Sequence, residues 1–153
     1  MILLAEPGAG KTALLGSIAE RVGARRVRAT GFRAGMGGSI LVVDAFDEVA
    51  RIGDARVLDI LHQIYDAEPE RVLLSSRSGE WEDAKTRLIG DLFGVEPQVV
   101  HLIPLENDEQ RQLFEHLHSE RSFDAFAEDI SRFDLHHLLG NPEFLHLFAG
   151  AYV

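Results

Sequence analysis

The sequence predicts an α/β protein with a mainly parallel sheet in three layers and a short helical extension after it. Four short apolar runs lack polar alternation, amphipathic helical stripes lie between them, and only helical patterns follow residue 104. Continuous apolar runs are typical of strands covered on both faces, and alternation of strand with helix favours parallel pairing. With 153 residues, 46% of them apolar, the chain is long enough to bury one substantial core.

The expected strands cover residues 2–5, 40–43, 72–76 and 99–103. An apolar stripe over 13–22 predicts a helix that ends at Gly23, and a second stripe over 57–65 predicts a helix that ends before Pro69. A further strand is expected near 26–30, but only residues 31–39 separate it from the next one. A parallel crossover normally needs about a dozen residues, so either the connecting helix is missing or this segment pairs differently.

Beyond residue 104, helices are expected over 108–118, 123–133 and 142–149. We therefore expect two parts, an α/β core over 1–104 and a helical extension over 105–153.

Composition excludes several classes of protein. The 15 basic and 25 acidic residues give a net charge of −10, which makes broad binding to nucleic acid unexpected. Arg25, Arg26, Arg28 and Arg33 form a local basic cluster, which we interpret as a solvated strand and loop. No apolar run is long enough to cross a membrane and no cysteine is present, so a cytoplasmic protein is expected.

A small-residue segment lies between the first strand and the first helix, and it reads Ala5-Glu6-Pro7-Gly8-Ala9-Gly10-Lys11-Thr12. It is nearly the phosphate-binding loop, whose first Gly is replaced here by Ala5. Gly8 and Gly10 still allow backbone N–H groups to curl around a polyphosphate, and Lys11 can reach the β and γ phosphates. The candidate nucleotide-binding residues are Pro7, Gly8, Ala9, Gly10, Lys11 and Thr12. The alternative is a glycine-rich turn with an exposed lysine.

A second segment, Ile40-Leu41-Val42-Val43-Asp44-Ala45-Phe46-Asp47-Glu48, is an apolar strand that ends in acidic residues. Ligands of open α/β sheets bind beyond the carboxyl ends of the strands, so Asp44 and Thr12 are candidate ligands of Mg²⁺. Asp47 and Glu48 are candidates to orient or deprotonate an attacking water. The alternative is an acidic helix start that complements the helix dipole.

Together these two segments resemble the NACHT group of STAND P-loop ATPases. In that group a small residue follows the magnesium-binding Asp, and an acidic pair comes two residues further on, as Ala45, Asp47 and Glu48 do here. AAA+ ATPases more often place Glu directly after the Asp. The spacing therefore favours the NACHT group and a three-layer P-loop NTPase fold.

Two later segments extend the resemblance. The run Leu73-Leu74-Ser75-Ser76-Arg77-Ser78 resembles the family's sensor strand, whose arginine points at the γ phosphate, and the alternative for Arg77 is an ion pair with a surface carboxylate. Gly140-Asn141-Pro142 resembles the element that packs a proline near the adenine, and the alternative for Pro142 is plain helix initiation. The resemblance also places the sensor strand between the first and third strands.

By this resemblance the chain is expected to be an Mg-ATP-binding, slowly hydrolysing switch in signalling, with a role in bacterial defence. ATP or ADP and Mg²⁺ are the implied cofactors, and nucleotide-dependent homo-oligomers are implied in a full-length context. The family's effector, winged-helix and repeat segments are absent from this sequence, so a fragment of a longer protein is one explanation. The alternatives are a nucleotide-holding interaction module without turnover, an AAA+-like ATPase, and, less favoured, a small-molecule phosphotransferase.

Overall fold

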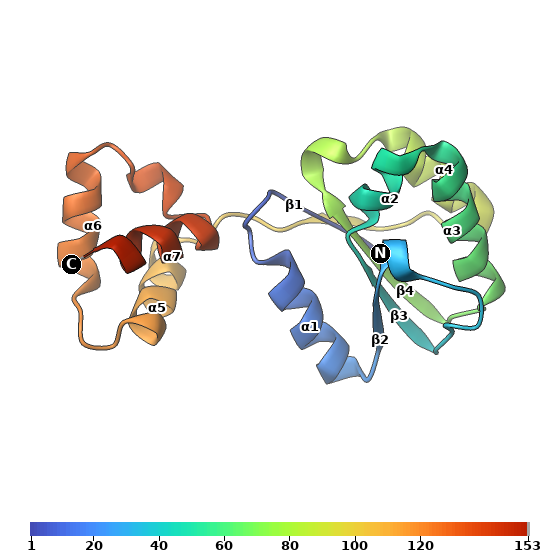
Figure 1. Ribbon diagram of the computed structural model, residues 1–153, viewed down its shortest axis with the longest axis horizontal. Coiled ribbons are helices and arrows are strands. Elements are labelled where there is room, and N and C mark those ends of the chain that lie inside the picture. Colours follow the sequence, from blue (N-terminus) through green and yellow to red (C-terminus); the bar gives the residue numbers. More distant parts are fainter. Residues whose placement is uncertain (153) are drawn as a thin grey trace. The chain divides into compact units, whose positions relative to one another are not determined.

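The computed structural model describes residues 1–152, and their strands form a five-stranded sheet of order β2-β3-β4-β1-β5 with every pair parallel (Figure 1). The strands are β1 (Ile2–Ala5), β2 (Arg25–Arg28), β3 (Ile40–Asp44), β4 (Arg71–Arg77) and β5 (Val99–His101). This confirms the predicted α/β fold. It also confirms that β4 lies between β1 and β3, as the resemblance implied.

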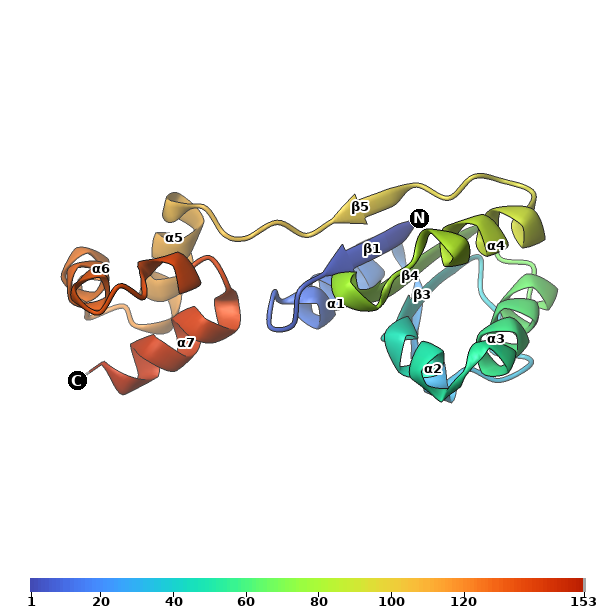
Figure 2. The ribbon, with the colours of Figure 1, turned by 90° about the horizontal axis from the view of Figure 1, so that it is seen from above.

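The chain divides into two compact units. The first contains residues 1–7 and 11–102, and the second begins at Ile103 and also includes the loop residues 8–10. The first unit carries the sheet, with β5 beside β1 at one edge (Figure 2).

Helices cover both faces of the sheet, as expected for a parallel sheet. Helix α1 (Lys11–Val22) packs on one face through Leu15 and Ala19, against residues of β1, β3 and β4. On the other face lie α2 (Phe46–Ile52), α3 (Asp54–Asp66) and α4 (Asp83–Phe93), whose apolar side chains form the larger core with the opposite side of the strands (Figure 1).

The structure differs from the sequence-based expectation in several places. Helices α2 and α4 were not predicted, because α2 has only 7 residues and α4 has only one buried residue, Ile89. Strand β5 ends at His101 rather than at residue 103. Strand β2 pairs in parallel with β3, and the crossover between them contains only the 3₁₀ turn Ala29–Gly31. The connecting helix is therefore missing, which was one of the two alternatives.

The second unit consists of α5 (Asn107–Leu117), α6 (Phe123–Arg132), the 3₁₀ turn His136–Leu138 and α7 (Pro142–Ala151). Its core gathers around Phe114, Phe123 and Phe126. Asn141 caps α7 by accepting the backbone N–H of Glu143 at 3.0 Å, and Pro142 stands in its first turn, where a proline loses no helical hydrogen bond. The three predicted helices are confirmed to within two residues at each end. Among residues 1–152, no helix is long and apolar enough to span a membrane.

Candidate functional site

The candidate site lies at the carboxyl ends of β3 and β4, next to the start of α1. Parallel strands end at the same edge of a sheet, so Asp44 at the end of β3 and Arg77 at the end of β4 come close to Lys11 and Thr12 in the first turn of α1. The structure thus brings together residues that are between 30 and 70 positions apart in the sequence.

The loop before α1 requires glycine at two positions. Gly8 has φ of 77° and Gly10 has φ of 85°, values that L side chains rarely adopt. The first turn of α1 contains no acidic residue, so its positive end faces no carboxylate from its own turn. Such a loop-to-helix junction suits an anion such as a phosphate.

Asp44 is a buried carboxylate with hydrogen-bond donors on both oxygens. Its Oδ1 accepts the Ser75 hydroxyl at 2.6 Å and the Ala45 backbone N–H at 2.8 Å. Its Oδ2 accepts the Thr12 hydroxyl at 3.3 Å and Nη2 of Arg26 at 3.2 Å. Hydrogen bonds to an ionised carboxylate stabilise the charged form, which burial alone would disfavour.

The pKa of the Asp44 carboxyl lies below its ordinary value as the result of opposing causes. Burial raises this pKa, but the Ser75 hydroxyl, the charge of Lys11, the Ala45 N–H and Arg26 together lower it by more. Asp44 is therefore charged at neutral pH and can attract a cation.

Ala45 turns the chain from β3 into α2 with a left-handed backbone, φ 58° and ψ 45°. A small residue tolerates this conformation better than a β-branched or bulky one. The turn puts Asp47 and Glu48 in the first turn of α2. Since successive residues on a helix point about 100° apart, the side chains of Asp47 and Glu48 point in different directions.

Asp47 points toward the cations of the site and is only 2% exposed. Its Oδ1 lies 3.6 Å from Nζ of Lys11, and its Oδ2 lies 3.4 Å from Nε of Arg77 and 3.8 Å from Nη2 of Arg51. Within residues 1–152, Oδ1 has no hydrogen-bond partner even though it is buried. A buried carboxylate oxygen in this condition is suited to receive a water or another donor.

Glu48 points toward β2 instead, where its carboxylate forms a two-point ion pair with the guanidinium of Arg28. The hydrogen bond and charge of Arg28 lower the pKa of the Glu48 carboxyl, and the same pair raises the pKa of Arg28. The two carboxylates that the sequence suggests for water activation are therefore separated by the structure, with Asp47 on Lys11 and Glu48 on Arg28.

The donor set near Asp44 fits Mg²⁺. The Thr12 hydroxyl and Asp44 Oδ2 are 3.3 Å apart, and Mg²⁺ takes few protein ligands and keeps several waters. The part of the chain that the structure describes holds no group of three or more His, Asp or Glu side chains arranged for a metal, so the protein would supply a minority of the ligands.

Two residues with clear roles at the site escaped the sequence analysis. Ser75 holds Asp44 across neighbouring strands, and Arg26 turns from β2 onto the same carboxylate. The register explains both: β2 pairs Arg28 with Asp44, and β4 runs beside β3. The basic cluster in the sequence was the available signal for Arg26, but only the pairing of β2 with β3 shows its target.

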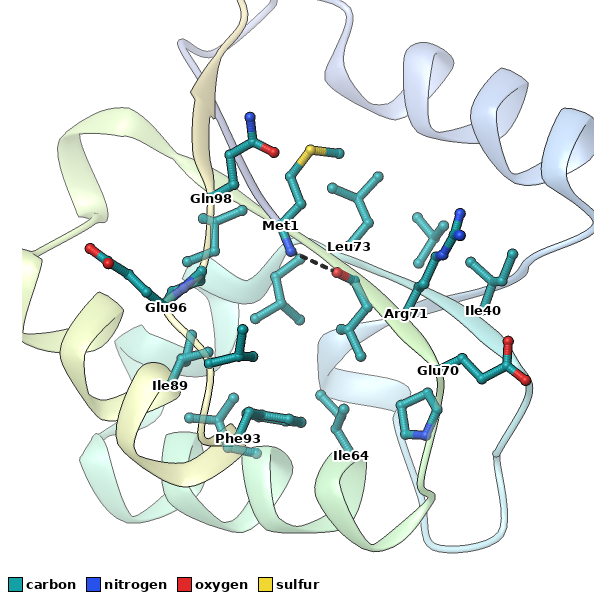
Figure 3. Close-up of a pocket in the computed structure, with 18 of the residues that line it drawn as sticks. Met1, Ile40, Ile64, Glu70, Arg71, Leu73, Ile89, Phe93, Glu96 and Gln98 are labelled. Atoms are coloured by element: carbon teal, nitrogen blue, oxygen red, sulfur yellow. Dashed lines mark hydrogen bonds between the residues drawn. The ribbon is translucent and has the colours of Figure 1, made fainter.

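A separate cavity of about 580 Å³ lies at the amino ends of the strands, whereas the candidate site lies at their carboxyl ends. Its walls are mainly apolar and include Met1, Leu73 and Phe93, and the Met1 amino group donates to the Val72 carbonyl at 2.9 Å inside it (Figure 3). None of the candidate nucleotide, metal or catalytic residues lines this cavity.

Ser75→Ala should lower the free energy of unfolding by about 1–3 kcal/mol, because it removes a hydrogen bond to a buried charge. Urea titration measures this change. Ser76→Ala on the same strand is the matched control, since the Ser76 hydroxyl makes only a 3.4 Å bond to the Arg77 carbonyl. Equal losses in the two variants would mean that the Ser75–Asp44 bond adds little.

No protein-family model matches the chain, and no curated protein matches it significantly. Solved structures do match. A DNA replication initiation factor is 18% identical with a TM-score of 0.59, over 98% of this chain and 52% of that one. A RuvB variant from Thermotoga maritima is 20% identical with a TM-score of 0.56, over 94% of this chain and 51% of that one.

A third similar structure is the replication initiator DnaA bound to AMPPCP and single-stranded DNA, 18% identical with a TM-score of 0.52, over 99% of this chain and 53% of that one. The chain thus spans about half the length of the structures that it resembles. At this level of identity the likeness establishes the fold alone, which is the three-layer P-loop NTPase fold with a parallel sheet.

Proposed function

We propose that this protein binds Mg-ATP and hydrolyses it slowly as a signalling switch of the NACHT/STAND type. The observation that carries the proposal is the cluster at the carboxyl ends of β3 and β4, where Lys11 and Arg77 meet the buried carboxylate of Asp47. Cations beside a glycine loop bind phosphate, and a carboxylate among them can act on water. In support, a protein of the same fold is described as bound to AMPPCP, an ATP analogue.

In this proposal each residue has a defined task. Backbone N–H groups of Pro7–Thr12, excluding the proline itself, surround the phosphates, and Lys11 pairs with the β and γ phosphates. Thr12 and Asp44 hold Mg²⁺, which when bound neutralises charge on the phosphate oxygens. Pro142 is assigned to the adenine by the resemblance alone.

Hydrolysis requires a base for the attacking water. The water attacks the γ phosphorus, its proton passes to a carboxylate, and ADP leaves. Asp47 and Glu48 are the two candidates, and Asp47 is the better positioned because its Oδ1 is buried and unbonded within residues 1–152, 3.6 Å from Lys11. Glu48 must first leave Arg28 to take this role.

The NACHT/STAND assignment rests on the spacing after Asp44. Ala45 occupies the left-handed turn, and the acidic pair follows in α2 rather than directly after the strand. A nucleotide-dependent change of assembly, with a role in bacterial defence, is part of this proposal. The chain spans about half the length of the structures that it resembles, and this part of the proposal concerns the whole protein.

The second candidate is a module that holds nucleotide without turnover. The ion pair between Arg28 and Glu48 favours it, because this pair keeps one of the two candidate bases away from Lys11. Phosphate release by the wild-type protein above the buffer rate would exclude this alternative.

Lys11→Ala should weaken ATP binding by about a hundredfold, since it removes a charged hydrogen-bond donor from the phosphates. Titration calorimetry with Mg-ATP measures the two dissociation constants. The second lysine of the chain, Lys85, is the natural control, because its Nζ donates to the Glu80 backbone carbonyl at 3.1 Å and lies 3.9 Å from the Glu82 carboxylate, neither of them in the glycine loop. If Lys11→Ala binds ATP as tightly as Lys85→Ala does, the phosphate-loop assignment is wrong.

Asp47→Asn should keep ATP binding and lower the rate of phosphate release by at least about a hundredfold, the usual contribution of a general base. Glu48→Gln should lower it less. A coupled phosphate assay under saturating Mg-ATP separates rate from binding. Asp54→Asn is the matched control, because it also removes a negative charge from the first turn of a helix, here at an exposed position of α3. A larger loss in Glu48→Gln would transfer the role of base to Glu48.

Arg77→Ala should weaken ATP binding more than ADP binding, because only ATP offers the γ phosphate to this guanidinium. The measurement is the ratio of the two dissociation constants, with Arg87→Ala, an exposed arginine on α4, as control. A ratio that does not change would leave Arg77 as the structural ion-pair partner of Asp47.

A further inference from the structure

Arg26 lies on the edge strand β2, yet its guanidinium turns onto the buried end of β3. Its Nη2 lies 3.2 Å from Oδ2 of Asp44, and the side chain is 36% exposed. Thr12 donates to this same oxygen, at 3.3 Å. Arg26 therefore contacts the oxygen of Asp44 that, with the Thr12 hydroxyl, forms the candidate Mg²⁺ donor set.

Among the hydrogen bonds and ion pairs that the structure describes, the other cations near Asp44 do not contact its Oδ2. Lys11 lies 3.9 Å from Oδ1, the other oxygen of Asp44, and nearer to Asp47. Arg28, two residues along the strand, is bound to Glu48. An arginine is always charged at physiological pH, so the charge of Arg26 at Oδ2 is permanent.

Helix α1 leaves room for this guanidinium. Gly16 lies inside the helix, where glycine costs about 1 kcal/mol relative to alanine. A Cβ at position 16 would lie 3.2 Å from Nη1 of Arg26, which within residues 1–152 is the only atom within 4 Å of it apart from the adjacent residues and the backbone of α1. No left-handed backbone requires a glycine here, and an alanine would require the Arg26 guanidinium to move by a few tenths of an ångström.

We propose that Arg26 is a built-in cation that competes with Mg²⁺ for Asp44 and so reduces the dependence of nucleotide binding on the metal. This rests on the proposed function for its nucleotide part. Two cations at one carboxylate oxygen repel each other, so Mg²⁺ binds only as the Arg26 contact loosens. Without metal, Arg26 offsets the charge of Asp44, which otherwise repels the phosphates.

A metal titration tests the competition directly. The nucleotide-free protein is titrated with Mn²⁺ and free Mn²⁺ is followed by electron paramagnetic resonance. Arg26→Ala should tighten Mn²⁺ binding by about fivefold, the effect of removing one partly exposed ion pair. Arg25→Ala is the matched control, because Arg25 lies on the same strand. In the part of the chain that the structure describes, its side chain donates one hydrogen bond, to the Gly37 carbonyl.

Nucleotide binding provides the second measurement. The dissociation constant of ATP is determined once in EDTA and once in Mg²⁺. The constant in EDTA divided by the constant in Mg²⁺ measures the metal dependence of ATP binding, and this ratio should be smaller in the wild type than in Arg26→Ala. Arg26→Ala should raise this ratio by about fivefold or more, since it strengthens metal-dependent binding and weakens metal-free binding. Gly16→Ala should change both quantities in the same direction but by less, because its Cβ crowds the guanidinium at 3.2 Å and keeps the charge in the chain.

Thermal melts confirm that each variant is folded, and Arg26→Gln, which removes the charge and keeps most of the side chain, carries the test if Arg26→Ala does not fold. Mn²⁺ affinities in Arg26→Ala and Gly16→Ala that equal the affinity in Arg25→Ala would overturn the competition. Tighter Mn²⁺ binding in Arg26→Ala, with no ATP binding to any variant, would support the competition at Asp44 and overturn the proposed nucleotide function.

Discussion

The candidate site depends on keeping one buried charge, the carboxylate of Asp44, in an environment that stabilises it. An isolated carboxylate at this depth would be strongly disfavoured by desolvation. Donors from several elements offset that cost: Ser75 from β4, Thr12 from α1, Arg26 from β2 and the N–H of Ala45. Each donor fixes the position of its own element, so the geometry of the site and the packing of three strands with one helix are a single arrangement.

The neighbouring carboxylate shows a different use of burial. Asp47 is surrounded by Lys11, Arg51 and Arg77, yet its Oδ1 keeps no hydrogen bond among the residues that the structure describes. Asp44 is fully satisfied, whereas Asp47 has charge compensation without full hydrogen bonding. A site with one satisfied and one unsatisfied carboxylate can hold a cation at the first and act on a donor at the second.

Much of the fold could be predicted because it rests on local patterns. The apolar runs identified β1, β3, β4 and β5, and the glycine loop and the acid after β3 identified the edge of the sheet where ligands bind. The parts that escaped depend on register or on short elements. Arg26 and Ser75 reach Asp44 only because β2 and β4 flank β3 in a specific register, which apolar spacing does not encode. The divergence of Asp47 from Glu48 follows from helix α2, which is too short to show a period.

The arginines of β2 have one more physical consequence, which comes from the position of that strand at the edge of the sheet. The outer side of an edge strand presents unpaired backbone groups, which invite pairing with another chain. Arg25, Arg26 and Arg28 place charge along this edge, and charge is a common protection against such association. The strand that contributes Arg26 and Arg28 to the candidate site is thus also the strand whose free edge most needs charge, so a neutral β2 would alter the site and the edge together.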